Sequence, residues 1–257
     1  MIENAEHKVD IDGTELRMQR GGEGTQVLFL HGAAGHQGWL PFADALAKDH
    51  DVIATEHPGF GLSDGYSWAD SIAKLADFYV KFLGTEGIGP VHLIGSSLGG
   101  WLASEIAVRD ESLLRSLTLI SPAGIYTPQL DLPDMLSMSY EELMRAVFAS
   151  SAVADMVLSQ PLTPEQMDMR ARNGKAVARL GARGFYNPDF PEQLSSITVP
   201  TTIIWGDTDR IVPTGYGPLW KAAIAHSTLH VLDDCGHLPH IECQAAVLDI
   251  LATRLPD

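Results

Sequence analysis

The 257-residue chain has little positive charge, few cysteines and no long apolar run, and each shortage excludes a class of protein. It carries 17 lysines and arginines against 33 aspartates and glutamates, which gives a formal net charge of −16. Such a protein repels nucleic-acid phosphates and anionic membranes, so we expect neither as a partner. The longest apolar runs, such as residues 201–205, are far too short to cross a bilayer. Residues 1–8 carry charge where a signal peptide needs an apolar centre, so we expect a cytoplasmic protein.

Only two cysteines are present, Cys235 and Cys243, and they flank Gly236 and His237. A bridge between them would strain a short segment that is argued below to be catalytic. We therefore predict two free thiols in a reducing cytoplasm. The histidines have no spacing typical of metal ligands, and neither G-x-G-x-x-G nor G-x-x-x-x-G-K occurs. No metal, nucleotide or other cofactor is expected.

Apolar runs alternate with amphipathic segments along most of the chain, which is the pattern of an α/β protein. A hairpin is predicted around the turn dipeptide Asp12-Gly13. Short buried strands are predicted at residues 27–30, 52–55, 91–94, 117–120, 201–205 and 229–232. Helices are predicted at residues 39–49, 67–83, 101–109, 216–225 and 244–255. This alternation predicts a mostly parallel central sheet with helices on both faces.

Residues 121–199 interrupt the alternation. They contain helical segments near residues 140–148, 151–159 and 164–180 but no clear strand. We interpret residues 121–199 as a helical cap inserted into a continuous α/β core domain, which is formed by residues 1–120 and 200–257.

The strongest chemical signal is the stretch Gly95-Ser96-Ser97-Leu98-Gly99-Gly100, between a predicted strand and a predicted helix. A glycine-flanked serine at such a turn is the nucleophile-elbow pattern, in which glycines permit a very tight backbone and leave the serine exposed. The stretch from Gly61 to Gly65 also matches G-x-S-x-G, but no strand directly precedes it. We therefore choose Ser97 over Ser63 as the candidate nucleophile.

A serine hydroxyl needs a base to take its proton, and the base needs an acid to hold its tautomer. His237 follows the last predicted strand, and Asp207 and Asp209 follow the strand before it. Both loops are expected to open at the carboxyl edge of the sheet, where Ser97 is also expected. The residues alone leave the choice between Asp207 and Asp209 open, since both belong to one loop and only geometry decides.

Four further motifs accompany the serine elbow. They are His31-Gly32-Ala33-Ala34-Gly35, residues 57–64 (HPGFGLSD), residues 205–213 (WGDTDRIVP) and Gly236-His237-Leu238-Pro239. Together the five motifs resemble the α/β-hydrolase family and, more narrowly, its serine-nucleophile members related to bacterial esterases and carbon-carbon bond hydrolases. The resemblance covers nearly the whole chain except the predicted cap.

The resemblance implies an α/β-hydrolase fold and a role for each site residue. It implies Ser97 as the nucleophile and His237 as the general base and acid. It implies Asp209 as the orienting carboxylate, because family members place this acid directly before a stretch like Arg210-Ile211-Val212-Pro213 and about this far ahead of the histidine. The backbone N–H groups of Ala33 and Leu98 are implied as the oxyanion hole.

The predicted cap is rich in methionine, with six of the eight: Met135, Met138, Met144, Met156, Met167 and Met169. Methionine suits adaptable apolar surfaces, so the cap's underside is predicted to receive an acyl or aryl group. Alternatively, these side chains pack a small core within the cap. The candidate substrate contacts are His31, Trp101, Met135, Met138, Tyr140, Met144, Phe148 and Leu238. Further aromatic candidates are Tyr126, Phe185 and Tyr186, and His31 is also a candidate for bracing its loop.

The later part of the predicted cap is locally basic, with Arg170, Arg172, Lys175, Arg179 and Arg183. Either one of these side chains pairs with a substrate carboxylate or they form a solvated helix face.

The expected function is hydrolysis of a small apolar carboxylic ester through an acyl-enzyme on Ser97, by a monomer or a homodimer. The nearest alternative is a carbon-carbon bond hydrolase of vinylogous diketones, the meta-cleavage-product type. Members of that branch often carry an aromatic residue directly after the triad histidine, where this chain has Leu238. A lactonase is a third possibility. A ligand-binding protein on the same scaffold is a fourth, which the presence of every triad residue disfavours.

Overall fold

Within residues 3–182 and 184–255, which the computed structural model describes, eight strands form one sheet in the order β1-β2-β4-β3-β5-β6-β7-β8. Their bounds are β1 (Asn4–Ile11), β2 (Thr14–Gly21), β3 (Thr25–Leu30), β4 (His50–Glu56), β5 (Val91–Ser96), β6 (Leu114–Ile120), β7 (Thr201–Gly206) and β8 (Ser227–Leu232). β1 and β2 form the predicted hairpin, and β2 pairs antiparallel with β4. All other neighbouring strands are parallel, so the prediction of a mostly parallel sheet is confirmed.

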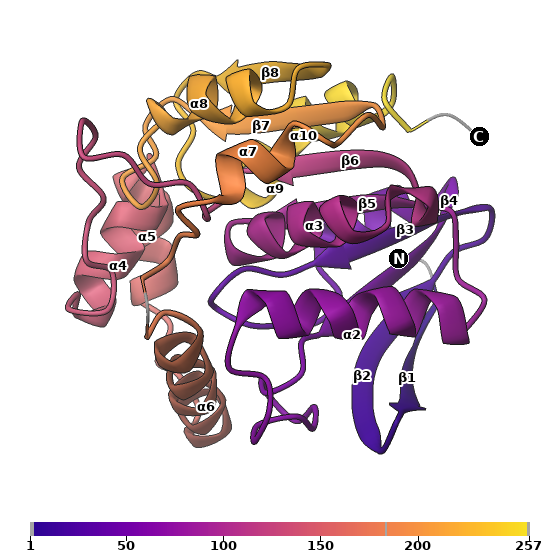
Figure 1. Ribbon diagram of the computed structural model, residues 1–257. Coiled ribbons are helices and arrows are strands. Elements are labelled where there is room, and N and C mark those ends of the chain that lie inside the picture. The colour runs from indigo at the N-terminus through magenta and orange to yellow at the C-terminus, as the bar shows by residue number, and fades with distance from the viewer. Residues whose placement is uncertain (1–2, 183, 256–257) are drawn as a thin grey trace.

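Helices cover both faces of the sheet, because alternate residues of each central strand point to opposite sides. Along β3, Val27 and Phe29 belong to the apolar cluster that contains residues of α1 (Pro41–Leu46) and α10 (Gln244–Leu251). Leu28 and Leu30 belong to the cluster that contains residues of α2 (Ile72–Thr85), α3 (Leu98–Arg109) and α8 (Tyr216–Ala223). Figure 1 shows α2, α3 and α8 on the near side of the sheet. Burial on both faces explains why the predicted strands are apolar runs without alternation.

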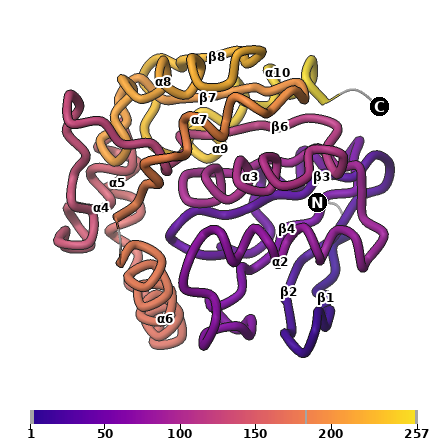
Figure 2. Tube along the Cα trace, in the orientation of Figure 1, coloured from indigo at the N-terminus to yellow at the C-terminus, as the bar shows by residue number. Residues whose placement is uncertain are grey.

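The segment between β6 and β7 contains the helices α4 (Tyr140–Val147), α5 (Ser151–Leu158), α6 (Pro164–Leu180) and α7 (Phe190–Leu194). Figures 1 and 2 show α4, α5 and α6 gathered beyond the carboxyl ends of the parallel strands, away from the helices on the sheet faces. Capping boxes at Ser139 and Thr163 begin α4 and α6. These three helices lie where the sequence predicts them.

Helix α7 is not evident in the sequence, since five residues are too few to establish a period. Its side chains Phe190 and Leu194 are fully buried, and the helix packs against α3 and α8. The end of the segment between β6 and β7 thus packs with the helices that cover the sheet. The division into a core domain and a cap, with boundaries at residues 121 and 199, stays a prediction.

The prediction of two free thiols is wrong, because Cys235 and Cys243 form a disulfide with their Cα atoms 6.2 Å apart. This separation is usual for a disulfide. The short helix α9 (Pro239–Glu242), whose four residues leave no period in the sequence, turns the chain back so that Cys243 meets Cys235. The argument from thiols to a reducing compartment therefore does not hold. Among the described helices, none has the length and apolar character that crossing a membrane requires.

Candidate active site

Ser97 lies in the turn between β5 and α3 and has a φ of 54°. Positive φ is uncommon for a residue with a side chain, and such strained backbone gathers at functional sites. Glycine is required on both sides of this turn. A Cβ at Gly95 would collide with the carbonyl oxygen of Gly99, and a Cβ at Gly99 would collide with the carbonyl oxygen of Leu30. The turn is held at the sheet edge by a hydrogen bond of 2.8 Å from the Ser97 N–H to the Ile120 carbonyl.

The structure brings Ser97, His237 and Asp209 together in one hydrogen-bonded chain. The Ser97 Oγ lies 2.9 Å from His237 Nε2, and His237 Nδ1 lies 2.8 Å from Asp209 Oδ2. All three residues are buried. The other oxygen of Asp209, Oδ1, accepts the N–H groups of Ile211 and Val212, each at 2.9 Å. This second pair of bonds fixes the carboxylate, so it can orient the imidazole.

Asp207 occupies a different position in the same loop. Its side chain is exposed, and its Oδ1 accepts the Thr208 hydroxyl at 2.7 Å and the Cys235 N–H at 3.2 Å. Hydrogen bonding, chiefly from Thr208, lowers the pKa of the Asp207 carboxyl. Asp207 therefore braces the loop, and it is Asp209 that contacts His237.

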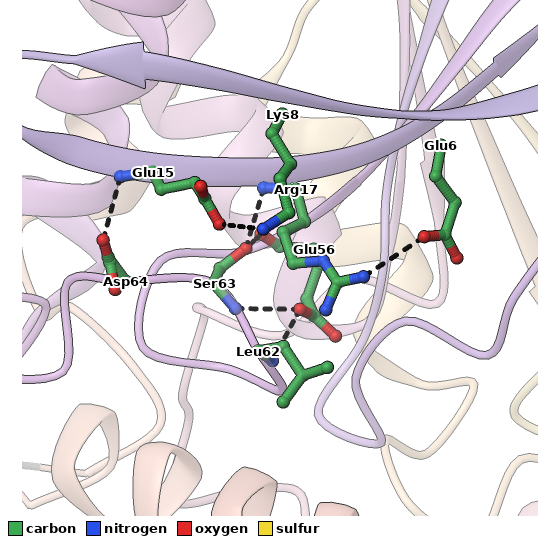
Figure 3. Close-up of polar contacts among 8 residues, drawn as sticks. All are labelled: Glu6, Lys8, Glu15, Arg17, Glu56, Leu62, Ser63 and Asp64. Carbon is green, nitrogen blue, oxygen red and sulfur yellow. Dashed lines mark hydrogen bonds and ion pairs between the residues drawn. The ribbon is translucent and has the colours of Figure 1, made fainter.

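The second G-x-S-x-G serine, Ser63, is held in a structural network near β2 (Figure 3). Its hydroxyl donates to the Glu56 carbonyl at 2.8 Å and accepts the Arg17 N–H at 3.0 Å. The Glu56 carboxylate accepts the N–H groups of Leu62 and Ser63, while burial raises its pKa. No histidine contacts Ser63 within this network, so its hydroxyl fixes the loop to the sheet.

A cavity of about 60 Å³ opens beside Ser97. Ala33 and Leu98, whose backbone N–H groups are the predicted oxyanion donors, both line it. Leu98 is the first residue of α3, so its N–H has no carbonyl partner within the helix and lies at the positive end of the helix dipole. The remaining wall is apolar and includes Ile125, Leu132, Met135, Phe185, Ile211 and Val212. Asp134 is the one charged residue among the described residues that line the cavity; it is exposed, and its Oδ1 accepts the Leu136 N–H at 3.2 Å.

Of the candidate substrate contacts, Met135 lines the cavity, as does Phe185 among the further aromatic candidates, and the others lie outside its wall. Trp101 is buried behind the wall, where its Nε1–H donates to Glu105 at 3.2 Å and its ring packs against Gly124. Phe148 is buried in the main apolar cluster, and Met138, Met144 and Leu238 pack against that cluster. The Tyr140 ring lies under the Arg170 guanidinium, 3.9 Å from its centroid. These side chains therefore contribute to packing rather than to the cavity wall.

His31 also lies outside the cavity wall. It is 4% exposed and its ring packs against that of His57, with ring centroids 3.7 Å apart and the planes tilted by 31°. Both of its ring nitrogens have backbone partners: Nδ1 faces the Gly32 carbonyl at 2.7 Å, and Nε2 accepts the His57 N–H at 3.1 Å. The structure thus places His31 as a brace of its loop, the other role considered for it.

None of the described basic residues of α6 lines the cavity. Arg179 stacks on Tyr66, 3.7 Å from the ring centroid, while Arg172 and Lys175 are exposed. Arg183 lies outside the described residues. In the part of the chain that the structure describes, no group of three histidine, cysteine, aspartate or glutamate side chains is placed to hold a metal ion.

A model of the alpha/beta hydrolase family matches residues 27–250, which is most of the chain and includes every element of the site. The chain belongs to the alpha/beta hydrolase family. The prediction of a hydrolase is thereby confirmed, and so is the predicted fold.

Proteins to which this alpha/beta hydrolase is similar carry different activities in their names. The chain is 30% identical over 248 residues to the dihydrolipoyllysine-residue acetyltransferase component of the acetoin cleaving system of Cupriavidus necator, covering 91% of this chain and 64% of that protein. It is 31% identical over 251 residues to a 2-hydroxy-6-oxononadienedioate/2-hydroxy-6-oxononatrienedioate hydrolase of Burkholderia vietnamiensis, covering 88% and 86%. The structure resembles that of the 2-hydroxy-6-oxo-6-phenylhexa-2,4-dienoate hydrolase of Rhodococcus sp. strain RHA1, with a TM-score of 0.80 at 20% identity over 98% and 99% of the chains. This last likeness shows the fold alone.

Sequence reasoning missed Glu242. In this alpha/beta hydrolase, Glu242 joins the loop that contains His237 to the segment between β6 and β7. Its carboxylate accepts the N–H groups of Gly236, Ala149 and Ser150 at 2.8, 3.0 and 2.9 Å. Next to these bonds, the His237 N–H donates to the Val147 carbonyl at 2.7 Å. The Glu242 side chain thus fixes both Gly236, which precedes His237, and the neighbouring backbone of Ala149 and Ser150. No local pattern in the sequence could identify it, because its partners in the inserted segment lie more than 90 residues away.

Asn173 makes a second connection, from α6 to the loop that contains Ala33. Its Nδ2 donates to the Ala34 carbonyl and its Oδ1 accepts the Gly61 N–H, both at 2.9 Å. Asn173 is buried in the middle of a helix. An asparagine within a helix is the only sequence signal for this contact.

Proposed function

We propose that this hydrolase cleaves small, uncharged carboxylic esters through an acyl-enzyme on Ser97. The observation that carries the proposal is the hydrogen-bonded chain from Asp209 through His237 to Ser97, which ends at an apolar cavity. Each member has the donor or acceptor that the reaction requires. Ala33 and Leu98 line the same cavity as Ser97, which supports their backbone N–H groups as the donors to the oxyanion.

In the first half-reaction, the Ser97 Oγ attacks the ester carbonyl carbon while His237 Nε2 takes the hydroxyl proton. His237 Nδ1 donates to Asp209, which keeps Nε2 unprotonated before the attack and stabilises the imidazolium after it. The tetrahedral intermediate collapses, the carbon-oxygen bond to the alcohol breaks, and His237 gives its proton to the departing alkoxide. Each backbone donor to the oxyanion contributes about 2.7 to 4 kcal/mol.

In the second half-reaction, water attacks the acyl carbon and gives a proton to His237 Nε2. The bond between the acyl carbon and Ser97 Oγ then breaks, the proton returns to Oγ, and the carboxylic acid leaves. These steps need no group beyond the side chains and backbone amides named here.

The charge of the cavity supports an uncharged substrate. Its one charged residue among the described residues, Asp134, is an acid, and the rest of the wall apart from Ser97 is apolar or backbone. A carboxylate in this space would lose its hydration without gaining a cation, at a cost of several kcal/mol. The cavity volume of about 60 Å³ also favours short acyl groups.

A second candidate function is hydrolysis of a carbon-carbon bond. It is favoured by the relative from Burkholderia vietnamiensis, which is 31% identical over most of both chains and whose name specifies a dienedioate or trienedioate substrate. Such a substrate carries two carboxylates, so this candidate requires a cation at the site. A lactone is the third candidate substrate for the same triad.

The experiment is burst kinetics on p-nitrophenyl esters of increasing acyl length, beside a dienol-diketone carboxylate, a simple lactone and the Ser97→Ala variant. A rapid burst on the shortest esters that depends on Ser97, with no cleavage of the dienol, supports the ester proposal. Turnover of the dienol without ester turnover replaces it with the second candidate. Binding of these compounds without turnover of any would favour a ligand-binding protein.

A further inference from the structure

A buried chain of polar side chains runs from β4 and α2 to the loop that contains Ala33. It consists of Thr55, Tyr79, His57 and His31, of which the first three are fully buried. The Thr55 hydroxyl lies 2.7 Å from the Tyr79 hydroxyl, which lies 2.8 Å from His57 Nδ1. The proposed reaction uses none of these four side chains. Buried polar groups that a protein retains without using them in chemistry need another explanation.

The position of each proton among these four side chains follows from the group at one end of the hydrogen-bonded series, the His31 carbonyl. His57 Nε2 faces the His31 carbonyl at 3.0 Å, and since a carbonyl can only accept, Nε2 carries the proton. Burial lowers the pKa of His57, so its ring is neutral and Nδ1 accepts from the Tyr79 hydroxyl. The Tyr79 oxygen is then left to accept from Thr55. Each donor therefore has one acceptor and the direction of the chain is fixed.

The protons of His31 are assigned in the same way. Its Nε2 accepts the backbone N–H of His57, so Nε2 is unprotonated and Nδ1 carries the proton. Nδ1 then donates to the Gly32 carbonyl at 2.7 Å. The Gly35 N–H donates to the same carbonyl at 3.1 Å.

The Gly32 carbonyl belongs to the same planar peptide unit as the Ala33 N–H. In a trans peptide the two bonds point in opposite directions, so fixing the carbonyl fixes the N–H. Ala33 lines the cavity beside Ser97, and its N–H is a proposed oxyanion donor. A small rotation of this peptide about its neighbouring bonds would turn the donor away from the oxyanion.

We infer that Thr55, Tyr79, His57 and His31 form a positioning network that aims the Ala33 N–H at the oxyanion. The inference rests on the proposed function, because it presumes an oxyanion formed at Ser97. His31 is the positioning residue that acts on the peptide directly. The other three hold its ring and tautomer.

The test uses two His31 variants that each keep one half of its hydrogen bonding. In His31→Asn the amide nitrogen can take the place of Nδ1 and donate to the Gly32 carbonyl. In His31→Gln the amide oxygen can take the place of Nε2 and accept from His57, while the donor to Gly32 is lost. Both variants replace the same ring and lose one of its two bonds, so a merely structural role would affect them alike.

With p-nitrophenyl acetate, we expect kcat of His31→Gln to fall by about 10² while His31→Asn retains most of it, with KM little changed in both. The affinity for phenylboronic acid, which forms a tetrahedral adduct on a serine hydroxyl, should fall in the same order. Tyr79→Phe removes the donor to His57 and should lower kcat by about tenfold, also without a change in KM. Ser116→Ala is the matched control, because it removes another buried hydroxyl contact to a histidine Nδ1, that of His92, at the opposite end of β5.

Equal kcat in the two His31 variants, or a kcat of Tyr79→Phe no lower than that of Ser116→Ala, would overturn the network even if Ser97→Ala is inactive. If neither His31 variant folds, the comparison of Tyr79→Phe with Ser116→Ala decides alone. Ester turnover that survives Ser97→Ala would instead overturn the proposed function and the network's role with it.

Discussion

Replacement of Glu242 by alanine should both destabilise the protein and slow its reaction. Hydrogen bonds to a charged group contribute about 1.5 to 3 kcal/mol each. Glu242 makes three, to Gly236, Ala149 and Ser150, but they share one half-buried carboxylate and are not additive. We therefore expect Glu242→Ala to lower the free energy of unfolding by about 3 kcal/mol.

The variant Glu242→Gln removes the charge but keeps two of the three bonds. A glutamine oxygen in the place of Oε2 can still accept the N–H groups of Gly236 and Ala149, so only the bond from Ser150 is lost. We expect it to cost about 1 kcal/mol. The activity should follow the same order, because Gly236 directly precedes His237. We expect the imidazole of His237 to be misplaced by a fraction of an ångström in Glu242→Ala, which should lower kcat by about tenfold.

The assays are urea unfolding and ester turnover, with Glu23→Ala as the control. Glu23 is exposed in the loop before β3, at the opposite end of the sheet. The reasoning is refuted if Glu242→Ala unfolds within about 0.5 kcal/mol of Glu23→Ala, the usual range of a surface substitution. It is also refuted if the alanine and glutamine variants have the same kcat.

Three further predictions follow from the site and the buried histidines. Asp209→Asn should lower kcat by about 10⁴, as loss of the orienting carboxylate does in a triad, whereas Asp207→Asn should change it little; the reverse order would move the acid to Asp207. Burial lowers the pKa of His57 and of His240 to about 3, so below pH 6.5 the unfolded chain binds protons that the folded chain does not. Stability should therefore be complete above that pH and fall as the pH drops toward 3, by about 3 kcal/mol for each histidine at pH 4.5. Thermal unfolding at pH 7 and at pH 4.5 checks this. The drop in Tm between the two pH values should be smaller for His240→Leu than for the unmodified protein, and an equal drop would contradict the prediction. Finally, Asp134→Asn should raise kcat/KM for an ester with a carboxylate on its acyl chain relative to the matched uncharged ester, and an unchanged ratio would exclude Asp134 as a source of selectivity.

The sheet and the reactive residues could be predicted because both depend on local signals. Buried parallel strands leave continuous apolar runs, and the helices of the inserted segment carry caps such as Thr163. The turn around Ser97 is marked by glycines that its backbone requires. His237 and Asp209 follow strands whose carboxyl ends must meet at one edge of a parallel sheet. Such signals need no knowledge of the rest of the chain.

The cavity wall and the disulfide could not be predicted, because they depend on how irregular segments fold. Leu132 and Ile125 belong to stretches without a period, so nothing marks them as lining residues, and Phe185 could be named only as one of several aromatic candidates. Cys243 reaches Cys235 only through the four-residue turn of α9. The contacts of His57 with Tyr79 likewise join elements that sequence patterns treat separately. Tertiary packing decides these features, and helical or strand periodicity carries no information about them.

The central claim is tested most directly by trapping the acyl-enzyme. Rapid mixing with p-nitrophenyl acetate, an acid quench within the burst and mass spectrometry of the digested protein would locate the acetyl group. The account predicts an acetylated peptide containing Ser97, absent from Ser97→Ala and formed far more slowly in a variant that lacks the His237 imidazole. An acetyl group on another residue, or hydrolysis that continues at the same rate in Ser97→Ala, would contradict it.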